Sequence, residues 1–307
     1  MGTPERRYPE TGELTIVIRA AGERTERACA AVLSAGVEHP SQCTVIHERP
    51  FSVAVRRTLE IGRDSGRPWL IAVDADLLPL ADVIDRVREV CGKMAPKAYC
   101  ATPLFLCNTI GGLATRGLHI YRASLLDEAL GIEPNALEPL RPESAIQDAM
   151  TRRGYTRECY AKIFGLHEYE QSYRHVYIKS LLRARKEPDL DALRARLGRA
   201  AGTSRDASVA LWAIDDAFKG EQPAEYDWRA PYPRFDERMR SAGMGEKQAF
   251  SITDIDAYVR ETIHAHDFVG DRSTQSWIRE LLGFERGAPD ALGYVDHPPL
   301  GAMRMES

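Results

Sequence analysis

The sequence lacks any long apolar segment. No stretch reaches the roughly 18 unbroken apolar residues of a membrane-spanning helix. The first ten residues, M-G-T-P-E-R-R-Y-P-E, have no apolar core like that of a signal peptide. We therefore expect a cytoplasmic protein without an integral membrane segment.

Paired cysteines and an excess of positive charge are also missing. The six cysteines lie at irregular spacings without a C-x-x-C pair, which favours buried thiols in a reducing compartment over a disulfide scaffold. The formal net charge is -4, so the long-range attraction to phosphate backbones is absent and nucleic acid is not expected as a partner. No G-x-x-x-x-G-K-S/T phosphate loop and no G-x-G-x-x-G segment occurs, so kinase and dinucleotide-binding functions lose their usual support.

Strand-like and helix-like segments alternate in the first part of the chain. Apolar runs at 14–19, 43–47 and 69–73 are each followed by a helical segment, at 25–36, 51–62 and 81–92. This alternation predicts an α/β fold, with a mostly parallel sheet and helices on both faces. Ligands of such sheets gather beyond the carboxyl ends of the strands. The polar side chains expected at that edge are Arg19, His47, Glu48, Asp74 and Asp76.

The pattern changes from about residue 99. Strands are predicted at 98–106 and 117–122, and helices at 124–130 and 143–154. Beyond His175 the chain is mainly helical and more charged. We expect an α/β domain over 1–186 and a mainly helical region over 187–307, which packs on that domain or shapes a binding site.

The segment W-L-I-A-V-D-A-D-L-L-P places Asp74 and Asp76 directly after an apolar strand. Two carboxylates that leave one face of an extended chain repel each other, so one pKa rises unless a cation lies between them. Oxygen ligands of this kind suit Mg²⁺ or Mn²⁺. In the alternative, one aspartate caps the next helix, with Pro79 at its start, and the other is solvated.

An apolar strand that ends in D-x-D also resembles the opening of haloacid dehalogenase-type phosphatases, in which the first aspartate is a nucleophile. In that family a threonine or valine follows, close to the N-terminus. Here Leu78 stands at that place, after two earlier strand and helix units. A phosphatase that uses Asp74 is therefore kept as the weaker alternative.

Residues 12–180 resemble nucleotide-sugar glycosyltransferases of the A-type fold, most closely family 2. The resemblance depends on the order of the segments L-T-I-V-I-R, V-A-V-R-R-T-L-E-I-G, R-P-W-L-I-A-V-D-A-D, G-L-H-I-Y-R and E-S-A-I-Q-D-A-M-T-R-R-G-Y. It implies a Rossmann-like catalytic domain that uses Mn²⁺ or Mg²⁺ and a nucleotide-sugar donor. The sugar would pass to the hydroxyl of a glycan, lipid-linked or small-molecule acceptor, with inversion as the default.

The resemblance also implies roles for individual residues. Asp76 would be the principal metal ligand, Asp74 would contact the metal or the donor ribose, and His167 would complete the metal shell. Imidazole suits Mn²⁺ better than Mg²⁺. The alternative for His167 is a hydrogen-bonded structural histidine.

The family's catalytic base lies in an acidic pair that opens a helix. Glu143 stands eleven residues before Gly154, as in that family, but Ser144 occupies the second acidic position. The base assignment therefore stays open between Glu143 and Asp148. The alternative for Glu143 is a structural glutamate in the first turn of a helix, where the helix dipole favours it.

Donor-binding residues are expected near the ends of the first two strands. The candidates are Arg19, Gly22, Glu23, His47 and Glu48, and Arg19 or Arg56 would add positive charge near the phosphates. The basic run from Lys179 to Lys186 is interpreted as a solvated helix face, with contact to an anionic acceptor or lipid headgroup as the alternative. A non-catalytic nucleotide-sugar-binding protein of the same fold is a further alternative, and the sequence leaves homo-oligomer formation open.

Overall fold

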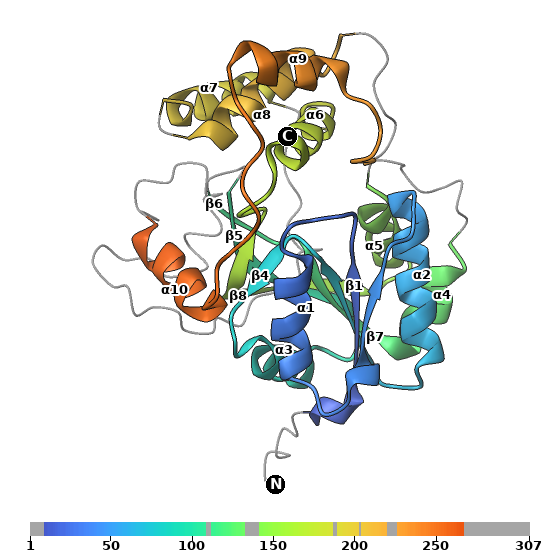
Figure 1. The fold of residues 1–307 in the computed structure, drawn as a ribbon. Helices are drawn as coiled ribbons and strands as arrows, with labels where there is room; N and C mark the ends of the chain where they lie inside the picture. The colour runs from blue at the N-terminus through green and yellow to red at the C-terminus, as the bar shows by residue number, and fades with distance from the viewer. Residues whose placement is uncertain are drawn as a thin grey trace, which may run out of the picture.

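A computed structural model describes residues 9–108, 112–132, 141–186, 189–202, 204–219 and 226–266. Its central element is a mixed sheet with the strand order β2-β1-β3-β7-β5-β8-β4, and β6 pairs with β5 (Figure 1). The strands are β1 Leu14–Arg19, β2 Cys43–Ile46, β3 Trp69–Asp74, β4 Leu77–Pro79, β5 Ala98–Cys107, β6 Gly112–Ala114, β7 Leu118–Arg122 and β8 Thr156–His167.

Helices cover both faces of the sheet. In the α/β part they are α1 Glu26–Ala35, α2 Phe51–Asp64, α3 Val83–Lys93, α4 Leu126–Leu130 and α5 Pro142–Arg152, with 3₁₀ turns η1 Thr11–Glu13, η2 Pro40–Gln42 and η3 Ala123–Leu125. Helices α1 and α3 lie on one face, and α2, α4 and α5 lie on the other (Figure 1). The longest strand pairings, β1 with β3 and β5 with β8, are parallel. The predicted α/β fold class is therefore confirmed.

Alternating side chains explain why both faces of the central strands are apolar. Ile71 and Val73 pack against α1 and α3, whereas Leu70 and Ala72 pack on the opposite face, against α2 and its neighbours. Gly62 was expected to end the second helix, but α2 continues to Asp64. A Cβ at Gly62 would lie 2.6 Å from Leu70 Cδ2, so the glycine allows the helix to approach the sheet closely.

Strands β4 and β8 are not predicted by the sequence pattern. Leu77–Pro79 pairs antiparallel with the end of β8, and Leu77 stands opposite His167. The pairing depends on Gly165, which has φ +153°, because a Cβ there would lie 2.3 Å from the Leu78 carbonyl oxygen. Pro79 therefore ends a strand and does not open a helix. This pairing brings His167 close to Asp74 and Asp76.

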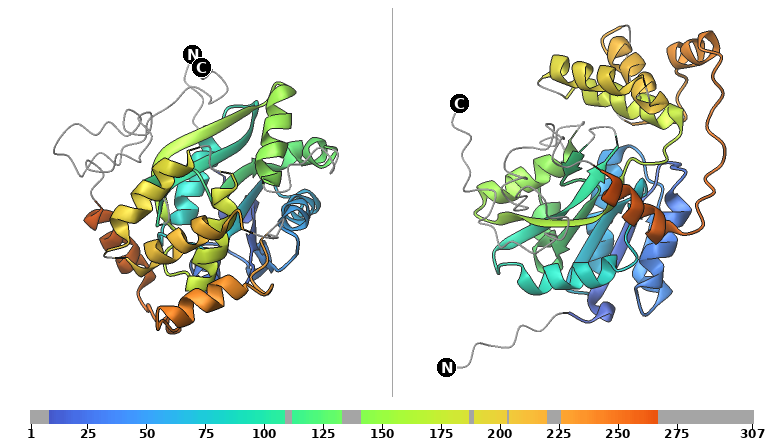
Figure 2. Two further views of the ribbon diagram at one scale, coloured as in Figure 1. Left: turned by 90° about the horizontal axis from the view of Figure 1, so that it is seen from above. Right: turned by 90° about the vertical axis from the view of Figure 1, so that its left-hand side faces the viewer.

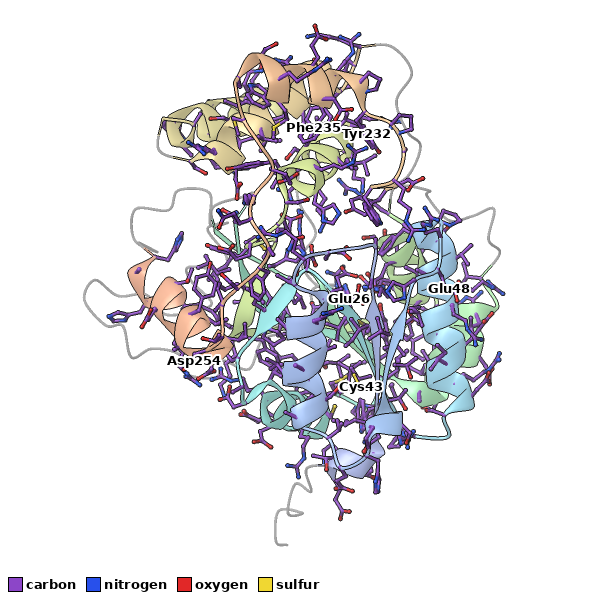
Figure 3. The ribbon with its side chains drawn as sticks, viewed as in Figure 1. Glu26, Cys43, Glu48, Tyr232, Phe235 and Asp254 are labelled. Carbon is purple, nitrogen blue, oxygen red and sulfur yellow. The ribbon has the colours of Figure 1, made fainter. Side chains whose placement is uncertain are left out.

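The helices after β8 form a second core. They are α6 Tyr173–Ala184, α7 Leu190–Ala200, α8 Arg205–Asp216 and α9 Pro233–Ser241. They lie over one end of the sheet (Figures 1 and 2). The Tyr177 ring of α6 lies 5.2 Å from that of Phe235 and 6.2 Å from that of Tyr232, both labelled in Figure 3. Helix α6 thus belongs to the helical core, although it precedes the boundary expected at Lys186.

Helix α10, Ile255–Ala265, returns to the α/β part and packs beside β4 and β8 (Figure 2). Val259 is its buried residue. Within the described ranges, no helix combines the length and apolar character that crossing a bilayer requires. All six cysteines are free thiols.

Candidate active site

A cavity of about 490 Å³ lies where β1 and β3 end, between the sheet and helix α6. Its lining comes from the connections after β1 and β2, the end of β3, the residues before β7, the first turn of α5, the end of β8 and helix α6. This is the edge of the sheet at which ligands of α/β proteins gather. The helical part therefore supplies one wall of the cavity.

Backbone hydrogen bonds fix the turn that carries the two aspartates. The Asp74 N–H donates to the Gly117 carbonyl at 2.7 Å, and the Ala75 N–H donates to the Arg19 carbonyl at 2.9 Å. The Asp76 carbonyl accepts the Glu168 N–H at 3.1 Å. The turn is thus held by the ends of β1 and β8 and by the residue before β7.

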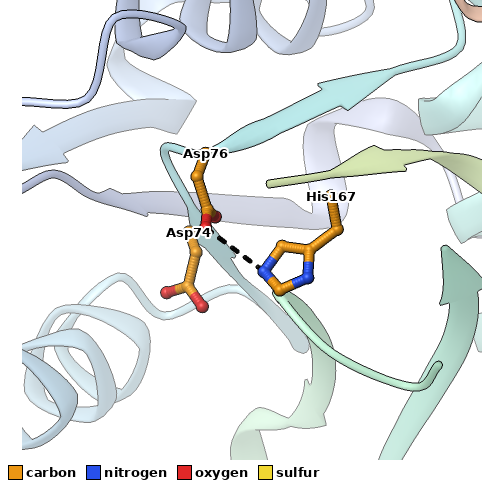
Figure 4. Close-up of side chains that lie close together, drawn as sticks. All are labelled: Asp74, Asp76 and His167. Atoms are coloured by element: carbon orange, nitrogen blue, oxygen red, sulfur yellow. Dashed lines mark ion pairs between the residues drawn. The ribbon is translucent and has the colours of Figure 1, made fainter. Parts of the chain in front are cut away.

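Asp74, Asp76 and His167 converge on one point of the cavity (Figure 4). One potential ligand atom from each lies within 4.8 Å of the other two. The Asp76 side chain is buried; its Oδ2 contacts Lys179 Nζ and lies 3.3 Å from His167 Nε2. Its Oδ1 is buried and has no hydrogen-bond partner within the described part of the chain. A buried, unpartnered carboxylate oxygen costs free energy, and a divalent cation would satisfy it. The two carboxylates and the imidazole therefore fit a metal such as Mn²⁺.

Electrostatics separate the two aspartates. Burial would raise the pKa of Asp76, but the charges of His167 and Lys179 outweigh it and hold that pKa well below its usual range. Burial raises the pKa of Asp74; Arg19 offsets part of this effect, and the Asp76 charge adds to it. For His167, burial is outweighed by Asp76, which raises its pKa well above the usual value. Without a metal, His167 is thus an imidazolium beside Asp76, and it must lose that proton to act as a ligand.

Arg19 connects Asp74 to Glu143. Its Nε donates to Asp74 Oδ1 at 2.9 Å, and its Nη2 forms an ion pair with the same oxygen at 2.8 Å. Its Nη1 and Nη2 donate to the two oxygens of Glu143 at 2.9 and 3.4 Å. Arg19 is therefore committed to two carboxylates, and Oδ2 of Asp74 stays outside this ion pair.

Glu143 accepts two further hydrogen bonds. The Tyr121 hydroxyl donates to Oε1 at 2.7 Å, and His119 Nε2 lies 3.1 Å from Oε2. The four acceptor positions of the carboxylate are thus occupied. Burial would raise the pKa of Glu143, but Arg19 and His119 outweigh it and hold that pKa well below its usual range. As positioned here, Glu143 is a weak base.

The structure brings most of the predicted site residues together. Those that line the cavity are Arg19, Glu23, Glu48, Asp74, Asp76, Glu143 and His167. Glu48, labelled in Figure 3, lies between β2 and α2. Burial raises the pKa of Glu23 to about 7, although Lys179 opposes the shift.

Four predicted residues lie outside the cavity lining. Asp148 is exposed on α5, because five residues of a helix turn it about 140° away from Glu143. Arg56 lies on α2 with Nε 4.0 Å from Glu60. His47 is exposed, with Nε2 3.2 Å from Glu26. Gly22, at φ +83°, packs so closely under Trp228 that a Cβ would lie 2.5 Å from that ring.

Several lining residues are not predicted as site residues by the sequence pattern. The basic run after β8 was expected to be solvated, but Lys179, Leu182, Arg183 and Lys186 line the cavity. Their spacing of three and four residues places them on one helix face, which is the available sequence signal. Further lining residues from other segments are Arg116, His119, Arg141, Gln147, Arg157 and Tyr226.

Comparisons with known proteins identify no family for this chain. A scan against protein-family models finds no match, and a search of curated proteins finds none either. Among solved structures, the mannosyltransferase PcManGT from Pyrobaculum calidifontis, in complex with GDP-Man and Mn²⁺, is 14% identical, with a TM-score of 0.37 over 69% of this chain and 77% of that chain. A197 from STIV is 11% identical, with a TM-score of 0.31 over 40% of this chain and 70% of that chain. TM-scores of this size carry no argument about function.

Proposed function

We propose that this chain is a metal-dependent glycosyltransferase that moves a sugar from a nucleotide-diphosphate donor to an acceptor hydroxyl, as in the A-type, family 2 enzymes that its sequence resembles. The observation that carries the proposal is the convergence of Asp74, Asp76 and His167. Among their atoms is Oδ1 of Asp76, which is buried and has no hydrogen-bond partner in the described ranges. This convergence joins the turn after β3 to His167, which lies 91 positions after Asp76 in the sequence. The cavity beside it is within the size range of small-molecule sites.

The positions of the lining residues suggest a different role for each. Asp76 and His167 would hold Mn²⁺ or Mg²⁺, and Asp74 would reach the same ion or the donor ribose through Oδ2. When bound, the metal neutralises charge on a departing diphosphate. Lys179 contacts Asp76 from α6 and would place a second positive charge beside the diphosphate. Arg19 is a positioning residue, because both its carboxylate partners are in the site.

Glu143 is the better of the two base candidates, because it lines the cavity and Asp148 does not. To take a proton, it must exchange one of its hydrogen bonds for the acceptor hydroxyl. The bond from Arg19 Nη2, at 3.4 Å, is the longest of those bonds and would be exchanged most easily. Donor contacts fall to Glu23 and Glu48, which line the cavity near the ends of β1 and β2.

Calorimetric titration with a panel of nucleoside diphosphates, with and without Mn²⁺, tests the proposal. We expect at least one of them to bind only with Mn²⁺, and Asp76→Asn to lose that binding. A matched control is Asp82→Asn, which removes an aspartate paired with Arg86 at 2.8 Å outside the cavity. Binding that does not depend on Mn²⁺, or that survives Asp76→Asn, contradicts the proposal. Phosphate release that is lost in Asp74→Asn would identify a phosphatase.

A further inference from the structure

Most acidic groups of the cavity are already neutralised by a basic side chain. The pairs are Arg19 with Asp74 and Glu143, Lys179 with Asp76, and Arg183 with Glu168. The other two acidic groups of the lining, Glu23 and Glu48, belong to the connections after β1 and β2.

Four further arginines nevertheless line the cavity. Arg49 pairs with Asp227 at 3.0 Å, and the other three are Arg116, Arg141 and Arg157. Arg141 Nη2 donates to the Lys186 carbonyl at 2.8 Å. Arg157, near the start of β8, has a buried Nε for which no described residue is a hydrogen-bond partner. Across the residues that the structure describes, none of the three forms an ion pair with a carboxylate. They are an excess of positive charge inside a cavity.

Arg116 lies close to other cations. Desolvation by the surrounding protein, and then repulsion by Arg183, lower the pKa of Arg116, and Arg141 contributes to the same shift. The Arg116 side chain is itself exposed to the cavity. Arg116 and Arg141 are thus neighbouring guanidinium groups without a carboxylate partner among the described residues. Such a pair is a favourable arrangement for a phosphate or carboxylate, which accepts charge-assisted hydrogen bonds from it.

Arg116 and Arg141 lie on a different side of the cavity from Glu23 and Glu48, the candidates for donor binding. Arg116 directly precedes Gly117, which holds the Asp74 backbone, and Arg141 lies two residues before Glu143 at the start of α5. In the strand order β2-β1-β3-β7, Asp74 ends β3, Glu48 follows β2 on one side, and Arg116 precedes β7 on the other. The excess charge is therefore next to the proposed base and across the metal group from the donor candidates.

We infer that Arg116 and Arg141 form a second anion site, which binds a phosphate or carboxylate of the acceptor. The acceptor is thus an anionic hydroxyl compound, such as a sugar phosphate or a uronate. Its hydroxyl reaches Glu143 while its anionic group is held by the arginines. The assignment of this anion to the acceptor rests on the proposed function; the anion site itself does not.

Calorimetry with three sugars of one size tests the inference: glucose 6-phosphate, glucuronate and uncharged glucose. The full chain is first saturated with Mn²⁺ and the nucleoside diphosphate that binds best, and each sugar is then added. We expect glucose 6-phosphate, glucuronate or both to bind, and glucose not to. The double variant Arg116→Gln/Arg141→Gln should weaken that binding at least tenfold, because hydrogen bonds to charged groups are lost, and should leave nucleotide binding unchanged. The two anionic arms show whether phosphate or carboxylate is preferred.

A matched control is Arg152→Gln, which removes an exposed arginine of α5 outside the cavity lining and should bind all ligands as the original chain does. Arg116→Glu alone should abolish anionic-sugar binding, and circular dichroism confirms that each variant is folded. The inference is overturned if no anionic sugar binds, if the sugars compete with the nucleotide, or if the double variant weakens nucleotide binding. If no nucleotide binds with Mn²⁺ but glucose 6-phosphate still binds through the arginines, the proposed function fails and the anion site stands.

Discussion

Lys179→Met is expected to make the stability of the chain depend on Mn²⁺. Lys179 Nζ contacts the buried Asp76 carboxylate, and removal of one partner of a buried ion pair costs about 3–5 kcal/mol. At about 2–4 °C for each kcal/mol, the melting temperature of the variant should fall by roughly 10 °C without metal. The same change removes an ammonium that repels a divalent cation at Asp76. A unit charge about 4 Å from another contributes about 4 kcal/mol at a dielectric constant near 20, so Mn²⁺ should bind the variant at least tenfold more tightly.

Thermal unfolding measured by circular dichroism, over a range of Mn²⁺ concentrations, separates these two effects. At 100 times its Kd the ion should restore about 2.7 kcal/mol of stability, and the variant should reach that point at a lower concentration than the original chain. Lys162→Met is the control, because it breaks a pair with Glu89 that lies outside the cavity. The reasoning is refuted if Mn²⁺ raises the melting temperature of Lys179→Met and Lys162→Met equally, or raises neither.

Three other predictions concern pH, backbone geometry and the base. Burial and then the Lys179 charge lower the pKa of the His175 imidazole to about 4, which is below the value of about 6.5 in the unfolded chain. The contribution of His175 to the free energy of unfolding is therefore fully present above pH 6.5. It falls by about 2 kcal/mol by pH 5. In urea titrations at pH 7 and 5, His175→Phe should remove this pH dependence of the free energy of unfolding. If the difference in stability between the two pH values is the same in His175→Phe as in the original chain, the prediction is refuted. Gly165→Ala should destabilise the chain by more than 2 kcal/mol, since its Cβ meets the Leu78 carbonyl, whereas Gly198→Ala in α7 should stabilise it by about 1 kcal/mol in the same titrations. Glu143→Gln should lower kcat at least 100-fold, and Asp148→Asn should leave it unchanged; equal losses of kcat in the two variants would contradict the assignment of Glu143 as the base.

The sequence predicts the central strands well because their signal is local. β1 and β3 are short apolar runs bounded by polar residues, and Asp74 and Asp76 follow directly from the end of β3. β8 is not predicted because three charged residues, Arg157, Glu158 and Lys162, interrupt its apolar pattern. Its pairing with β4 is a tertiary contact without a local sequence pattern.

The lining of the site is harder to predict because its partners are far apart in the sequence. Arg19 and Glu143 are separated by 124 positions, and no single segment contains both. Lys179 and Arg183 belong to a basic run that is typical of a solvated helix. Their orientation toward the cavity follows from the packing of α6 on α8 in the second core. A buried helix face can be recognised only when its neighbours are known.

Pulsed electron paramagnetic resonance of bound Mn²⁺ tests whether Asp76 and His167 hold a metal ion. We expect one Mn²⁺ per chain with a nitrogen coupling from an imidazole. That coupling should disappear in His167→Gln, and the ion should be lost in Asp76→Asn. Absence of bound Mn²⁺, or a spectrum that His167→Gln leaves unchanged, would refute the metal site.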